Sequence, residues 1–170
     1  MINGESVERA CSEVDQYTDE QMAAEFDRFF RTQPALCEFI VEVTHESGQK
    51  IQELSLFLSY MTFKALEMSG PGSLKTVKPE TMEAAYHETE SWMTRLSLAG
   101  ENELQSSIAG SLQRDSEPFL LQYVISELNE PMEDGEDLSD EEKGEVFFVL
   151  KTVITSLCNE ASQTSLPDKA

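Results

Sequence analysis

The sequence predicts an all-α fold, a single-domain bundle of about seven helices with a pseudo-two-fold internal duplication around two central apolar helices. Three observations lead to this prediction. Apolar residues recur at spacings of three and four along most of the chain, and residues that favour helix starts and stops separate these segments. No stretch alternates between apolar and polar residues for long enough to indicate a sheet. The length of 170 residues fits a single domain over 1–170.

Four helices are predicted in the first part of the chain. Val7, Cys11 and Val14 lie four and three residues apart, which places them on one face of a short first helix. The second helix is expected to begin near Thr18, whose hydroxyl can accept a hydrogen bond from the first-turn N–H groups. Pro34 fits the first position of the third helix, because an N–H there would lack an intrahelical partner in any case. The third helix is expected to run to about residue 46 and the fourth from about 49 to 68, before the Ser-Gly-Pro-Gly break at 69–72.

The middle of the chain holds one clear helical stripe and one weak one. A helix over 79–98 is predicted from apolar positions three and four apart that end before Gly100, namely Met82, Ala85, Tyr86, Thr89, Met93 and Leu96. Trp92 lies on the flank of this stripe. A thinner stripe follows, weakened by serines and a glycine, at Leu104, Ile108 and Leu112.

Two further helices are predicted near the end of the chain. The first opens at Pro118 and ends near Asn129. Ser139 and Glu142 have the spacing of a capping box, so the last helix is expected to start there and to run to about Ala161. Residues 162–170 are expected to be a frayed tail.

Two parts of the chain resemble one another. The segment Pro34-Ala-Leu-Cys-Glu-Phe-Ile-Val aligns without a gap with Pro118-Phe-Leu-Leu-Gln-Tyr-Val-Ile, and in each copy an acidic turn and a very apolar helix follow. We interpret about 18–69 and 101–161 as repeat-like halves joined by helix 79–98. The alternative is that any two buried helices that begin at a proline look alike. Because a helix that is apolar on most of its circumference must be covered on several sides, the two apolar helices are predicted to form a central pair.

Composition excludes several classes of function. With 12 basic and 33 acidic residues the formal net charge is −21, so the surface repels DNA, RNA and anionic lipid. Three cysteines are too few and odd in number for a disulfide framework. The first residues lack the basic and apolar regions of a secretory signal, and the longest apolar stretches are too short to span a membrane. We therefore expect a cytoplasmic protein with no direct nucleic-acid binding and no membrane contact.

One helical face combines carboxylates with an imidazole. Glu80, Glu83, His87 and Glu90 lie on the polar side of helix 79–98, where they could share a divalent metal ion. A di-metal site in a helical bundle needs Glu-x-x-His on two helices that face the core, whereas this chain has His-x-x-Glu once and opposite the apolar stripe. The favoured interpretation is a solvated acidic face, so no metal and no cofactor is expected.

The loop before the last helix concentrates the negative charge. From Glu130 to Glu145 there are nine acidic residues and one lysine. A calcium loop of the EF-hand type is disfavoured, because Met132 would fall on a ligand position. We interpret the loop as an exposed patch for a charge-dependent partner, formed by Glu133, Asp134, Glu136, Asp137, Asp140 and Glu141.

No catalytic residue is predicted. The chain contains none of the Gly-rich phosphate loops, the nucleophile elbow or the Cys-x-x-Cys pair, and Cys37 and Cys158 occur within apolar stripes. The sequence therefore favours a non-enzymatic cytosolic module for protein interaction or regulation, with a protein partner or a second copy of the chain. One alternative is an acidic binder of basic proteins or a mimic of nucleic-acid charge. The other is a metal-dependent enzyme that uses the carboxylate and histidine face of helix 79–98.

Overall fold

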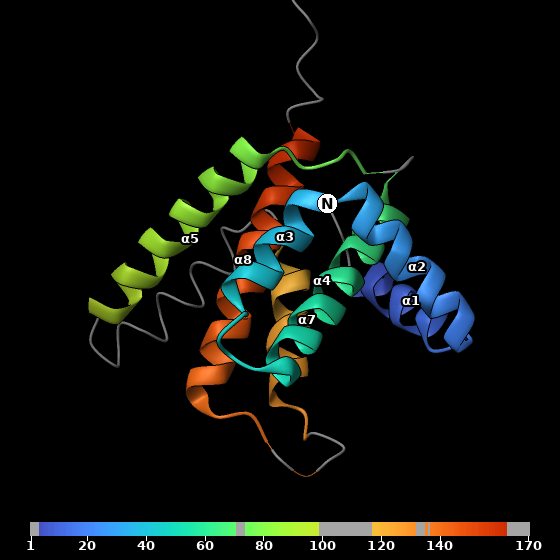
Figure 1. The fold of residues 1–170 in the computed structure, drawn as a ribbon, viewed down its shortest axis with the longest axis horizontal. Helices are drawn as coiled ribbons and strands as arrows, with labels where there is room; N and C mark the ends of the chain where they lie inside the picture. The colour runs from blue at the N-terminus through green and yellow to red at the C-terminus, as the bar shows by residue number, and fades with distance from the viewer. Residues whose placement is uncertain (1–3, 71–73, 99–116, 132–134, 136, 163–170) are drawn as a thin grey trace, which may run out of the picture.

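The computed structural model shows an all-α bundle, as predicted (Figure 1). The structure describes residues 4–70, 74–98, 117–131, 135 and 137–162, and no strand occurs among them. The helices of this part of the chain are α1 (Gly4–Val14), α2 (Asp19–Thr32), α3 (Pro34–Val43), α4 (Gln49–Ser69), α5 (Pro79–Leu98), α7 (Pro118–Asn129) and α8 (Asp140–Ser162). The predicted stripe at Leu104, Ile108 and Leu112 and the predicted tail from 163 onward lie outside the described residues.

The predicted helix starts are confirmed by their capping bonds. The backbone N–H of Gln21 donates to Thr18 Oγ1 at 3.2 Å, and the Thr18 N–H donates to Gln21 Oε1 at 2.8 Å. The same reciprocal pair forms between Ser139 and Glu142, at 3.2 and 2.7 Å. These bonds satisfy N–H groups that a helix start leaves without intrahelical partners. The prolines at 34 and 118 occupy the first turns of α3 and α7.

The third helix is shorter than predicted. α3 ends at Val43, whereas the sequence led us to expect about residue 46. Thr44 Oγ1 donates to the carbonyl oxygen of Ile40 at 2.6 Å, and the Ser47 N–H donates to the Thr44 carbonyl at 3.2 Å. Local hydrogen bonds of this kind compete with continued helix, so the chain turns here toward α4.

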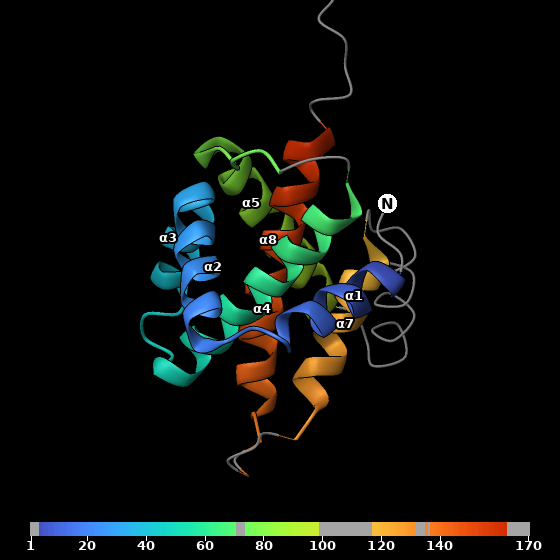
Figure 2. The same ribbon diagram turned by 90° about the vertical axis from the view of Figure 1, so that its right-hand side faces the viewer.

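α4 and α8 form the centre of the bundle and pack against each other, as predicted (Figures 1 and 2). Every residue from 58 to 66 of α4 and from 149 to 158 of α8 is buried. α1 packs along α4, α5 packs along α8, and α7 contacts α8 and α1, while α3 contacts both central helices. A helix surrounded in this way can carry apolar residues around most of its circumference, which explains why the stripes of α4 and α8 are so broad.

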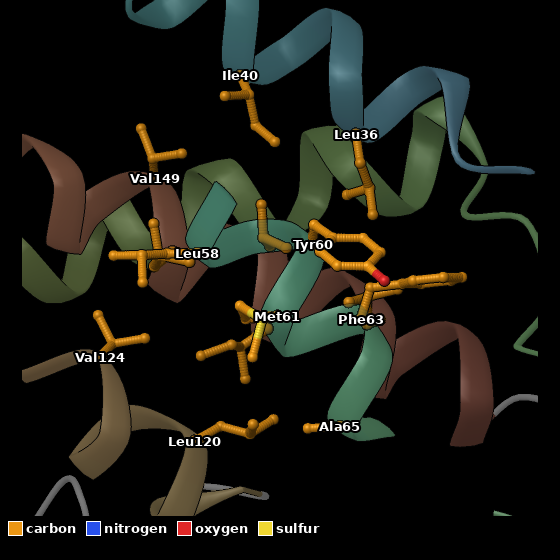
Figure 3. Packing of buried hydrophobic residues seen from close by; sticks show 14 of the residues in the cluster. Leu36, Ile40, Leu58, Tyr60, Met61, Phe63, Ala65, Leu120, Val124 and Val149 are labelled. Atoms are coloured by element: carbon orange, nitrogen blue, oxygen red, sulfur yellow. The ribbon is translucent and has the colours of Figure 1, made fainter. Parts of the chain in front are cut away.

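One continuous apolar core joins these helices. Figure 3 shows side chains of α3, α7 and α8 that surround the side chains of α4. The residues at two aligned positions of the proline-led segments are fully buried in both segments: Leu36 and Ile40 of α3, and Leu120 and Val124 of α7. Both segments therefore contribute these positions to the core. The internal duplication itself stays a prediction.

Candidate functional site

The four residues considered for a metal site lie on the outer face of α5. Glu80, Glu83, His87 and Glu90 are all exposed. His87 Nδ1 lies 3.5 Å from Glu90 Oε2, and this is a contact between successive turns of one helix. Among the residues that the structure describes, no three histidine, cysteine or acidic side chains come together closely enough to hold a metal ion.

The acidic patch is described in part. Asp137, Asp140 and Glu141 are exposed around the first turn of α8, whereas Glu133, Asp134 and Glu136 lie outside the described residues. Leu138 is buried within the core and anchors this end of the loop. The described carboxylates therefore point to solvent from a fixed helix start, where negative charge also complements the helix dipole.

A different cluster of charges lies where α1, α2 and α4 meet. We name it the tri-helix cluster, and it joins three carboxylates, two cations and two phenols: Glu13, Tyr17, Glu25, Arg28, Tyr60, Lys64 and Glu67. Ionisable side chains from three helices meet in it. Its members were not predicted from the sequence.

Lys64 is the buried cation of the tri-helix cluster. Its Nζ lies 2.8 Å from Glu13 Oε1 on α1 and 3.6 Å from Glu25 Oε2 on α2. The ammonium group also lies 5.6 Å from the centre of the Tyr17 ring, and the Tyr17 hydroxyl donates to Glu13 Oε1 at 2.7 Å. One cation from the central helix thus connects the two helices that cover it.

Arg28 forms the second centre of the tri-helix cluster. Its guanidinium donates to both carboxylate oxygens of Glu67 on α4, at 2.8 Å each, and to both of Glu25, at 3.0 and 2.9 Å. The Tyr60 hydroxyl donates to Glu25 Oε2 at 2.9 Å. Paired parallel bonds of this kind are among the stronger ones in proteins, and they fix the orientation of both partners.

The contacts within the tri-helix cluster move the pKa values of Glu25, Lys64 and Tyr60 further from pH 7. Hydrogen bonds from Arg28, assisted by Tyr60, lower the pKa of Glu25 to about 2 against the opposing effect of burial. Burial opposes the charge on Lys64, but its bonds to Glu13 and Tyr17 outweigh burial and raise its pKa. Burial raises the pKa of Tyr60. General acid–base catalysis works best with a pKa near the operating pH, which this arrangement does not provide.

A second set of buried polar groups holds the segment Leu74–Lys78, which we name the strap. The Gln33 side chain is fully buried; its Nε2 donates to the Lys75 carbonyl at 2.9 Å, and its Oε1 accepts from the Val77 N–H at 2.9 Å. Glu160 on α8 is 3% exposed, and its Oε2 accepts from Thr81 Oγ1 at 2.7 Å. Burial alone would raise the pKa of Glu160, but the bonds from Thr81 and from the strap lower it, so the carboxylate stays ionised.

None of the three cysteines, all of which the structure describes, forms a disulfide. Cys37 and Cys158 are buried, as the apolar stripes indicated, and Cys11 is half-buried. Burial raises the pKa of Cys37 to about 12 and also raises the pKa of Cys11. The thiolate, which is the nucleophile and the metal ligand, is therefore disfavoured at both positions.

Sequence reasoning missed the tri-helix cluster because its partners are far apart in the chain. Glu67 lies 39 positions after Arg28, and no spacing rule links them. Two signals were present: Glu25 and Arg28 are three residues apart, and Lys64 interrupts a very apolar helix. A lysine in a helix that must be covered on all sides needs a counter-charge from a neighbouring helix.

No helix in the described part of the chain is long and apolar enough to cross a membrane. A comparison with protein-family models, with curated proteins and with solved structures gives no match to this chain.

Proposed function

We propose that the chain is a non-enzymatic helical module for protein interaction or regulation. The tri-helix cluster carries this proposal, because its charges are paired across helices and its pKa values are moved away from neutrality. A catalytic site usually does the opposite and holds an acid or base near the working pH. The cluster joins three helices, and the proposal assigns contact with other molecules to exposed side chains.

The described surface includes three large apolar side chains. Phe30 on α2 is 40% exposed, Val41 on α3 is 38% exposed, and Phe119 on α7 is 42% exposed. Aromatic residues are enriched in protein interfaces, where they bury a large area at a small cost in side-chain entropy. The two phenylalanines are therefore the first candidates for anchoring a partner.

The partner is a protein rather than a nucleic acid or a membrane. A formal charge of −21 repels phosphate groups, and it also opposes close approach of two copies of this chain. A different protein is thus favoured over a homodimer. A cytoplasmic location is part of the same proposal, and it is supported by three cysteines that form no disulfide, because disulfides are rare in that compartment.

Affinity capture with a salt series tests this proposal. Immobilised wild type is compared with Phe30→Ser and with Phe119→Ser, each first checked for folding by circular dichroism. We expect wild type to retain a partner as the salt concentration rises from about 0.1 M to about 1 M. One of the two variants is expected to retain about tenfold less of it. Light scattering reports any dimer in parallel. A monomer that captures nothing, or a partner that neither variant affects, contradicts the proposal.

A second candidate function is binding of a basic protein through the acidic patch. The exposed positions of Asp137, Asp140 and Glu141 at a fixed helix start favour it. The attraction between the exposed carboxylates and a basic partner weakens once salt screens it, so such a partner is expected to dissociate as the salt concentration rises. Retention at high salt, with loss in a phenylalanine variant, separates the first candidate from this one.

A further inference from the structure

α5 is joined to the bundle differently from the other helices. Met82 is the one α5 residue, among those whose side chains the structure describes, that belongs to the continuous apolar core. The other fully covered positions of α5 are small or polar, namely Thr81, Ala85 and Thr89. Because buried apolar area is the main source of stability, the described side chains of α5 contribute less to the core than those of α4 or α8 do.

The position of α5 is peripheral. It forms an outer layer along α8, with a smaller contact on α3, and lies on the opposite side of the molecule from α1 and α2 (Figure 1). Half-buried aromatic rings line this contact. The ring centres of Tyr86 and Phe148 are 5.4 Å apart, and those of Trp92 and Phe147 are 5.9 Å apart. The Nζ of Lys151 lies 6.0 Å from the centre of the Trp92 ring.

The N-terminal end of α5 is held by buried hydrogen bonds. Glu160 accepts from Thr81 Oγ1 at 2.7 Å and lies 3.5 Å from Lys78 Nζ. Two positions before α5 begins, the buried Val77 donates its N–H to Gln33, which also donates to the Lys75 carbonyl. α5 is therefore fixed at its start by specific polar bonds. Along its length it is held by the buried Met82, Ala85 and Thr89 and by aromatic rings that are half covered.

We propose that α5 and the strap form a hinged lid over α8, which Glu160 and Gln33 hold shut and which opens as one unit while the rest of the bundle stays folded. Segments with few buried apolar contacts open locally at a lower free energy than the core does. Opening uncovers a face of α8 that is both apolar and cationic, with Phe147, Phe148 and Lys151. The lid does not depend on the interaction function proposed above.

Native-state hydrogen exchange of the full chain tests the lid. In the wild type we expect the backbone amides of Ala85–Met93 to exchange about tenfold or more faster than those of Leu58–Leu66 on α4. The variant Glu160→Gln is expected to accelerate the α5 amides by about a further tenfold, because a bond to a charged acceptor is lost, and to leave the α4 amides unchanged. The control Glu83→Gln removes an exposed carboxylate from α5 itself and is expected to change neither set.

A second variant covers the case in which Glu160→Gln fails to fold. Gln33→Leu removes both bonds to the strap with a side chain of similar size, and it is expected to accelerate exchange at the Val77 amide and along α5. Equal protection of α5 and α4 in the wild type overturns the proposal. Uniform acceleration of α4, α5 and α8 in the folded variants overturns it as well, because the bonds then stabilise the whole bundle and not a separate lid.

Discussion

Lys64→Met is the substitution that most simply tests the structural role of the tri-helix cluster. The variant keeps the length and the apolar stem of the side chain and removes the charge. Glu13 and Glu25 then lose the cation that lies 2.8 and 3.6 Å from them. Fully burying an unpaired charge costs about 3–5 kcal/mol, but the Glu13 side chain is 44% exposed and Glu25 keeps Arg28. Solvent screening and the second cation reduce the loss, so we expect the free energy of unfolding to fall by about 2 kcal/mol.

Urea unfolding followed by circular dichroism at pH 7 measures this loss. We expect the midpoint to fall at an unchanged slope, because the folded surface stays the same. In a domain of this size the melting temperature is expected to drop by about 4–8 °C. Lys75→Met, at an exposed position, is the matched control and is expected to stay within about 0.5 kcal/mol of wild type. A Lys64→Met protein as stable as wild type would show that the ion pairs of Lys64 do not stabilise the fold, since the cost of desolvating Lys64 would then cancel them.

Three further predictions concern stability and metal ions. Glu25 has its pKa lowered to about 2 in the folded state, so its contribution to stability is complete above about pH 5 and is lost as the pH falls toward 2. Between pH 5 and pH 2 the free energy of unfolding, measured with urea, is expected to fall less in Glu25→Gln than in wild type. Parallel pH dependences of the two proteins would count against this. The hydroxyls of Ser55, Ser59 and Thr62 are buried on one face of α4 without a hydrogen-bond partner. Thr62→Val is therefore expected to raise the free energy of unfolding by about 1 kcal/mol, and a loss of similar size would show that the hydroxyl is in fact satisfied. The α5 residues considered for a metal site, Glu80, Glu83, His87 and Glu90, are exposed on one helix. Millimolar zinc or magnesium is therefore expected to give the same melting temperature as a chelator does. A shift in melting temperature that His87→Ala abolishes would support a metal site on α5.

The helix boundaries could be predicted because local chemistry sets them. Thr18 with Gln21, and Ser139 with Glu142, satisfy the free N–H groups of a helix start from within four residues, so the pattern is visible in the sequence. Pro34 acts in the same local way. The breadth of the apolar stripes was enough to place α4 and α8 at the centre, since only a surrounded helix tolerates apolar residues on all sides.

The polar interior could not be predicted because it depends on the packing of distant segments. Gln33 holds the backbone of the strap 42 and 44 positions later, and Glu160 bonds a threonine 79 positions earlier. In sequence, Gln33 resembles an ordinary linker residue and Glu160 an ordinary acid near a helix end. Only the crossing of the helices turns them into buried partners. Their burial, rather than their residue type, marks them as important.

We infer that the half-buried charges of this chain hold its helices together. A double-mutant cycle on the pair that joins α2 to α4 tests this inference. Arg28 and Glu67 are 31% and 19% exposed and share two bonds of 2.8 Å. Urea unfolding of wild type, Arg28→Met, Glu67→Gln and the double variant is expected to give a favourable coupling energy of about 1.5–3 kcal/mol. A coupling energy within about 0.3 kcal/mol of zero would contradict this inference, because the two side chains would then contribute independently to the fold.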